Sequence, residues 1–239
     1  MKKISWVQLC FTFVGVFLGA GFVSGQELWK FFACFGAAGL AGFLVSAVIM
    51  TAAHGALLGL VRSTGEARIG FLMTRGDSSL LRTALLALQY LFLFGVVVIM
   101  IAGAAESLSG LTGLSTILLG AIVTLVIFVL ALCGLQSLVA SFSALVPVIT
   151  VCAVVIAVVV ISGWKGQTAE FAPEASLLRP NWYVSAATYA AYNLFGSLTT
   201  MIPLAEHIPD GKTLRKGLLS GNVVLLLIAM SMIAAMLVC

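Results

Sequence analysis

Three polar residues, Ser24, Gln26 and Glu27, interrupt a hydrophobic stretch that covers residues 6–38. An ionisable side chain inside an apolar segment of membrane length is costly and usually serves a function. Ser24 and Glu27 have the spacing of a capping box, in which a serine and a glutamate three positions later start a helix. We therefore expect a new helix to begin at Ser24, with Glu27 completing its cap or serving as an ion or proton partner.

Glycines weaken the helix just before this signal. Gly15, Gly19, Gly21 and Gly25 follow one another closely, and each destabilises a helix by about 1 kcal/mol relative to alanine. A break near 19–25 would free amides that attract an anionic group such as a carboxylate. The freed carbonyls, including those of Gly19 and Gly21, would be able to hold sodium. Because unwound backbone at membrane depth is buried in protein or lines a cavity, the pattern predicts a small-molecule or ion site.

Two other interpretations of these residues stay open. Gly15 with Gly19, and Gly21 with Gly25, are pairs of small residues four positions apart, which allow two helices to pack closely. Glu27 could instead lie at the outer interface and pair with Lys30. On these interpretations the stretch serves packing or anchoring and binds no solute.

A second interruption is expected in the sixth apolar segment. Asn193, Gly196 and Ser197 interrupt its apolar run, and Pro203 removes a helix hydrogen bond. Tyr192 and Asn193 offer polar groups on the upper half of this segment. We expect a broken helix here, with a simple kinked helix as the competing interpretation.

The composition places all these residues in a membrane. Of 239 residues, 62% are hydrophobic and 8% are charged, with a mean hydropathy of +1.21, whereas soluble domains have about 25% charged residues. We expect a polytopic all-α bundle that forms one transmembrane domain over residues 1–239. Seven apolar segments are predicted, at about Ser5 to Phe32, Gly36 to Val61, Thr83 to Ser107, Leu114 to Cys133, Gln136 to Ser162, Tyr183 to His207 and Gly217 to Cys239.

Basic residues predict the orientation of these segments. With a cytoplasmic N-terminus, nine lysines and arginines fall inside and three fall outside, which is the positive-inside bias. We therefore expect a multi-pass protein of the cytoplasmic membrane whose partners are the lipid bilayer and a small solute. The inside residues are Lys2, Lys3, Arg62, Arg68, Arg75, Arg82, Lys212, Arg215 and Lys216, and the outside residues are Lys30, Lys165 and Arg179.

The two interrupted segments predict an inverted repeat. Segments one and six are five apart, so they cross the membrane in opposite directions. Interrupted segments at corresponding positions of two inverted halves indicate a transporter site. We expect a first repeat over about 5–163 and a partial second repeat over about 183–239.

Two motifs resemble a known family. "FTFVGVFLGAGFVSGQELWKFF" and "YNLFGSLTTMIPLAEHIPDGKTLRKG" resemble the YkvI-like family of bacterial membrane proteins, which is similar to the amino acid, polyamine and organocation transporter superfamily with the LeuT-type fold. The resemblance implies a ten-helix core with substrate and coupling cation between broken helices one and six. It also implies that helices 8–10 are missing here, of which the eighth commonly contributes to the cation site.

These expectations combine into one functional hypothesis. We expect a secondary transporter of amino acids or related small organic solutes, coupled to sodium or protons and working by alternating access. A membrane nutrient sensor that uses the same pocket without transport, and an inactive fragment of a transporter, are the alternatives. No enzymatic motif, cofactor or metal cluster and no basic patch for nucleic acid is expected. The candidate solute- or ion-binding residues are Gly19, Ala20, Gly21, Ser24, Gly25, Gln26, Glu27, Tyr192, Asn193, Gly196 and Ser197.

Overall fold

The structure is a computed structural model that describes residues 3–74, 79–164, 166 and 179–238. Within these ranges the chain is helical and contains no strand, as predicted. Of the residues used to predict orientation, Lys2, Arg75 and Lys165 lie outside the described residues. The helices are α1 (Trp6–Phe17), α2 (Ala20–Val23), α3 (Gln26–Phe31), η1 (Ala33–Phe35), α4 (Ala37–Thr64), α5 (Ile69–Met73), α6 (Ser79–Thr112), α7 (Thr116–Leu132), α8 (Gly134–Ser162), α9 (Trp182–Ala205) and α10 (Gly211–Val238).

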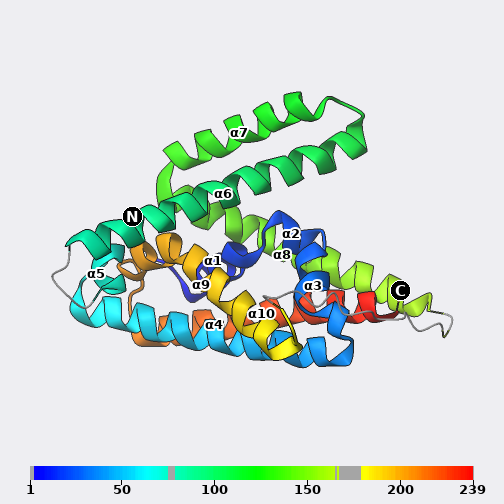
Figure 1. The fold of residues 1–239 in the computed structure, drawn as a ribbon. Helices are drawn as coiled ribbons and strands as arrows, with labels where there is room; N and C mark the ends of the chain where they lie inside the picture. Colours follow the sequence, from blue (N-terminus) through cyan, green and yellow to red (C-terminus); the bar gives the residue numbers. More distant parts are fainter. Residues whose placement is uncertain (1–2, 75–78, 165, 167–178, 239) are drawn as a thin grey trace.

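All seven predicted apolar segments are found as helices. In the described part of the chain, α4, α6, α8 and α10 are each long and apolar enough to cross a membrane. The ends of the described chain lie at opposite ends of the helices (Figure 1). This placement is what an odd number of crossings requires.

The predicted interruption of the first segment is present, and the chain bends there twice. The backbone leaves the helix at Leu18, where φ is −80° and ψ is 73°. After the four residues of α2 it turns again at Gly25, which has a left-handed φ of 79°. Glycine adopts this conformation without strain, which is why the turn falls there.

The predicted cap at Ser24 is wrong. The Ser24 hydroxyl donates to the carbonyl of Gly21 at 3.3 Å, and α3 is preceded by Gly25 with no side-chain cap. The left-handed turn at Gly25 moves the helix start one residue further along. Glu27 therefore cannot close a box with Ser24, and its carboxylate is engaged elsewhere.

The predicted break in the sixth segment is also wrong. Helix α9 runs without interruption through Asn193, Gly196 and Ser197. The Asn193 amide donates to the carbonyl of Tyr189 at 2.9 Å, and the Ser197 hydroxyl lies 2.9 Å from the carbonyl of Leu194. These two side chains reach carbonyls one turn earlier in α9 and do not interrupt the helix at their own positions.

Helices α1, α4, α8, α9 and α10 pack into one bundle, while α6 and α7 form a hairpin beside it (Figure 1). Glycines on α10 let α1 approach closely. A Cβ at Gly221 would lie 2.8 Å from the Phe13 ring and 3.1 Å from the carbonyl oxygen of Cys10. This close contact fixes α1 up to the point where it ends beside α9.

Helix α10 begins with a pH-sensitive cap. The Asp210 carboxylate accepts a hydrogen bond from the Thr213 amide at 2.6 Å, and this bond lowers the pKa of Asp210 below its ordinary value. A carboxyl group with a lowered folded-state pKa stabilises the fold above its unfolded pKa and loses that contribution as pH falls through the folded value.

We therefore expect the unfolding temperature of the wild-type chain to fall relative to Asp210→Asn as pH drops from about 6 to about 3. Asparagine caps a helix as well but does not titrate. Thermal unfolding followed by circular dichroism in detergent at several pH values measures the difference. Identical pH curves for the two chains would contradict the assignment.

Candidate functional site

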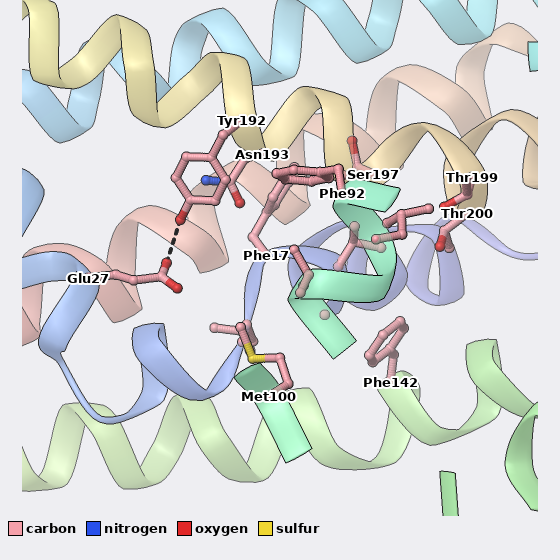
Figure 2. Close-up of a pocket in the computed structure, with 17 residues that line it drawn as sticks. Phe17, Glu27, Phe92, Met100, Phe142, Tyr192, Asn193, Ser197, Thr199 and Thr200 are labelled. Atoms are coloured by element: carbon pink, nitrogen blue, oxygen red, sulfur yellow. Dashed lines mark hydrogen bonds between the residues drawn. The ribbon is translucent and has the colours of Figure 1, made fainter. Parts of the chain in front are cut away.

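A cavity of about 250 Å³ lies beside the interruption of the first segment. Its walls come from the end of α1, the middle of α6, α8 and the middle of α9, so segments far apart in sequence meet there (Figure 2). The lining residues are Gly15, Val16, Phe17, Leu18, Gly19, Glu27, Phe92, Leu93, Val96, Met100, Phe142, Tyr192, Asn193, Gly196, Ser197, Thr199 and Thr200.

Glu27 and Tyr192 form the polar end of this cavity. The Tyr192 hydroxyl donates to Oε2 of Glu27 at 2.6 Å (Figure 2). Both side chains are partly buried, and the Phe31 ring lies 5.7 Å from the Tyr192 ring. Hydrogen bonds to ionised groups are stronger than those between neutral groups. This bond links α3 to α9 across one end of the cavity.

The second oxygen of Glu27 lies against α2. A Cβ built on Gly21 would come within 2.6 Å of Glu27 Oε1, so a larger residue at this position would require the carboxylate to shift. The acidic group beside the interruption is thus the chain's own side chain. Lys30 is not its ion-pair partner among the described residues; the carbonyl of Lys30 instead accepts a hydrogen bond from Arg179.

The structure brings six of the eleven candidate residues to the cavity and leaves four outside its lining, while the side chain of Ala20 lies outside what the structure describes. Ser24 and Gln26 are exposed, whereas Gly25 is buried and a Cβ there would overlap the Met236 methyl group. The lining residues are Gly19, Glu27, Tyr192, Asn193, Gly196 and Ser197, and the residues outside it are Gly21, Ser24, Gly25 and Gln26. Their role in binding stays a prediction.

Ser197 borders the cavity, but its hydroxyl is directed away from the cavity and forms a hydrogen bond with a neighbouring helix. Its side chain is 1% exposed, and Oγ lies 2.7 Å from Nε2 of His54 on α4. In Figure 2 the Ser197 oxygen points away from the other lining side chains. The contribution of Ser197 is therefore to join α9 to α4.

Sequence reasoning missed most of the apolar wall. Phe92 and Met100 come from α6, and Phe142 comes from α8. No local signal identifies them, because only the packing of distant helices brings them to the interruption. Thr199 had a signal: Pro203 lacks the N–H that would bond the Thr199 carbonyl four residues earlier.

The packing interpretation of the glycines also holds. A Cβ at Gly15 would overlap the Phe142 ring, and one at Gly19 would lie 2.7 Å from the Met100 methyl group. These glycines therefore both admit neighbouring helices and line the cavity. Packing and a site are compatible here, because the close approach of α6 and α8 is what builds the cavity wall.

Chemically, the site combines one carboxylate with aromatic and thioether walls. Small-molecule sites are typically apolar with a few placed polar groups, and this cavity fits that description. Hydroxyl groups of Thr199 and Thr200 lie away from Glu27, near the opposite side (Figure 2). Such an arrangement suits a small organic solute with polar groups at both ends.

Comparison with known proteins identifies one similar membrane protein. The chain is 28% identical over 233 residues to the uncharacterized membrane protein YkvI of Bacillus subtilis (strain 168), an alignment that covers 95% of this chain. It spans 65% of the length of that protein. No family model matches the chain, and no solved structure matches it. Together with the long apolar helices, this similarity makes the chain a membrane protein in contact with the lipid bilayer.

Proposed function

We propose that the chain forms the solute-binding part of a secondary transporter for amino acids or related small organic solutes. The observation that carries the proposal is the double interruption of the first segment beside a cavity that contains Glu27. Transporter sites lie where membrane helices are discontinuous and line a cavity. A charged residue inside a membrane segment is a functional candidate on energetic grounds.

Coupling to sodium or protons and alternating access are part of the same proposal. Glu27 is the candidate ion or proton partner, because its carboxylate reaches the cavity and accepts a hydrogen bond from Tyr192. The short helix α2 and the glycine turn at Gly25 give the first segment two points at which α3 is able to change direction relative to α1. The resemblance of the sequence motifs to transporters supports the same function.

Uptake into proteoliposomes tests the proposal. The 239-residue chain is reconstituted, and tritiated alanine, glutamate and lysine are supplied separately with an imposed sodium or proton gradient. Uptake above that of protein-free liposomes, dependent on one gradient, is the expected result. Binding of a solute without gradient-driven uptake would favour the sensor alternative. Absence of both binding and uptake for a wider amino-acid panel would contradict the proposal.

We expect Tyr192→Phe to lower this uptake by about threefold to tenfold, because it removes one hydrogen bond to Glu27 and leaves the ring in place. Tyr183→Phe is the matched control, since Tyr183 lies at the start of the same helix and is 57% exposed. Initial uptake rates of both variants are compared with wild type. Equal loss in both variants would show that the Tyr192 hydroxyl has no specific role.

A further inference from the structure

His54 lies behind the cavity wall and contacts two of the helices that form it, α9 and α1. The side chain is fully buried on α4. Nε2 lies 2.7 Å from the Ser197 hydroxyl on α9. The ring also makes edge contacts with Phe13 and Phe17 of α1, at centroid distances of 5.4 and 5.6 Å. Phe17 is the last residue of α1 before the interruption and lines the cavity.

The hydrogen bonds of His54 define where its hydrogens lie. Nδ1 is 2.7 Å from the carbonyl oxygen of Met50, which is able only to accept, so Nδ1 must carry a hydrogen. In the neutral ring Nε2 is then bare and accepts from the Ser197 hydroxyl. In the charged ring Nε2 donates to Ser197, whose hydroxyl turns to the carbonyl of Leu194 at 2.9 Å. Both forms satisfy every partner without moving a heavy atom.

In either form the single hydrogen of Ser197 is used inside the protein. The Ser197 side chain is therefore held in one direction, toward α4. Its neighbour Gly196 and the residue one turn later, Thr200, both line the cavity. A bond that fixes Ser197 thus fixes the rotation of the α9 segment that presents these two residues. A second bond between the same helices, from the Ser46 hydroxyl to the carbonyl of Ala186 at 2.9 Å, lies nearer the start of α4, and neither residue lines the cavity.

We propose that His54 is a positioning residue of the solute site: through Ser197 it sets the orientation of the cavity-lining face of α9. The proposal rests on the cavity being the solute site. His54 itself touches no solute. Buried polar bonds between helices specify one arrangement over others because an unpaired partner in a low-dielectric interior is costly.

Two substitutions of similar polarity separate positioning from stability. The amide of glutamine reaches the position of Nε2, so His54→Gln retains the bond to Ser197. The amide of asparagine reaches only the position of Nδ1, so His54→Asn retains the bond to Met50 and loses Ser197. Both variants lose the ring contacts with Phe13 and Phe17. Ser197→Ala removes the same bond from the α9 side.

The readout is the reactivity of a cysteine introduced by Thr200→Cys, in a chain that also carries Cys133→Ser, Cys152→Ser and Cys239→Ser. The remaining cysteines, Cys10 and Cys34, are buried. The probe is 2-aminoethyl methanethiosulfonate, and measuring its reaction with the cysteine requires no transported solute. Failure of this test is therefore distinguishable from failure of the proposed function. Unfolding temperature is recorded for every variant.

We expect His54→Asn and Ser197→Ala to change the modification rate by about threefold to tenfold, and His54→Gln to stay within about twofold of the parent. A chain that carries both His54→Asn and Ser197→Ala should show no larger change in modification rate than either single variant. Unchanged rates in His54→Asn and Ser197→Ala, with only lower unfolding temperatures, would overturn the proposal. Equal effects of glutamine and asparagine would overturn it as well.

Nitrogen-15 NMR of histidine-labelled chain in lipid supplies a second measurement. The sequence contains only two histidines, and His207→Gln assigns the signals. We expect a protonated Nδ1 in His54 and an Nε2 signal that moves in Ser197→Ala. A bare Nδ1, or an Nε2 signal indifferent to Ser197→Ala, would refute the bonding on which the proposal depends.

Discussion

Glu27→Gln is expected to reduce solute uptake by roughly 10-fold to 100-fold, the loss that follows when a hydrogen-bonded charge is removed from a desolvated site. The substitution keeps the length of the side chain and one acceptor oxygen. Tyr192 is therefore still able to donate to position 27. What disappears is the charge that faces the cavity, so the loss should appear in binding and coupling rather than in folding.

Glu106→Gln is the matched control for this change. Glu106 lies near the end of α6, is exposed and does not line the cavity. Initial uptake rates in proteoliposomes, at equal amounts of reconstituted protein, compare the two variants. Full uptake by Glu27→Gln would remove the carboxylate from the mechanism. Equal losses in both variants would indicate a general effect of charge on insertion or stability.

The helices were predictable from sequence because membrane length and hydropathy are properties of each segment alone. The interruption of the first segment was predictable for the same local reason, since its glycines weaken the helix where they stand. Its detail was not. The turn falls at Gly25 because that residue takes a left-handed conformation, and the serine before it looked like a cap only by residue type.

The sixth segment shows how local reasoning fails in the opposite direction. Asn193 and Ser197 are polar and were expected to mark a break, but their partners lie within α9 and on α4. Whether a polar residue interrupts a membrane helix or joins it to a neighbour depends on what the neighbour offers. His54 was the missing partner, 143 positions away in sequence. No pattern within the segment carries that information.

The candidate site likewise contains residues that the sequence identifies and residues that it does not. Glu27 and Tyr192 were chosen from their own segments, and the structure places them 2.6 Å apart. The aromatic wall formed by Phe92 and Phe142 was out of reach, because it depends on how α6 and α8 approach α1. Polar groups in apolar segments are visible in a sequence, whereas apolar lining residues look like every other core or lipid-facing residue.

The position of α3, and with it Glu27, depends on a tight reversal of the chain between α3 and α4. Phe32 is fully buried there, and its ring lies 4.9 Å from Tyr189 and 5.1 Å from Phe43. Gly39, in the first turn of α4, packs directly on the Phe32 backbone. A Cβ at Gly39 would overlap the carbonyl group of Phe32. Backbone is unable to swing aside as the end of a flexible side chain does.

We therefore expect Gly39→Ala to lower the free energy of unfolding by about 1–3 kcal/mol, the usual range for overpacking, which lowers the unfolding temperature by roughly 2–4 °C per kcal/mol. Gly59→Ala is the matched control, because Gly59 lies in the same helix and nothing is within 4 Å of a Cβ there. That variant should be unchanged or slightly more stable, since alanine favours helix. Thermal unfolding in detergent measures the stability of both variants.

The clash at Gly39 should also displace α3. Gly39→Ala should therefore reduce uptake even below its unfolding temperature, whereas Gly59→Ala should not. Identical stability and uptake in the two variants would show that the reversal at Phe32 does not hold Glu27 in place.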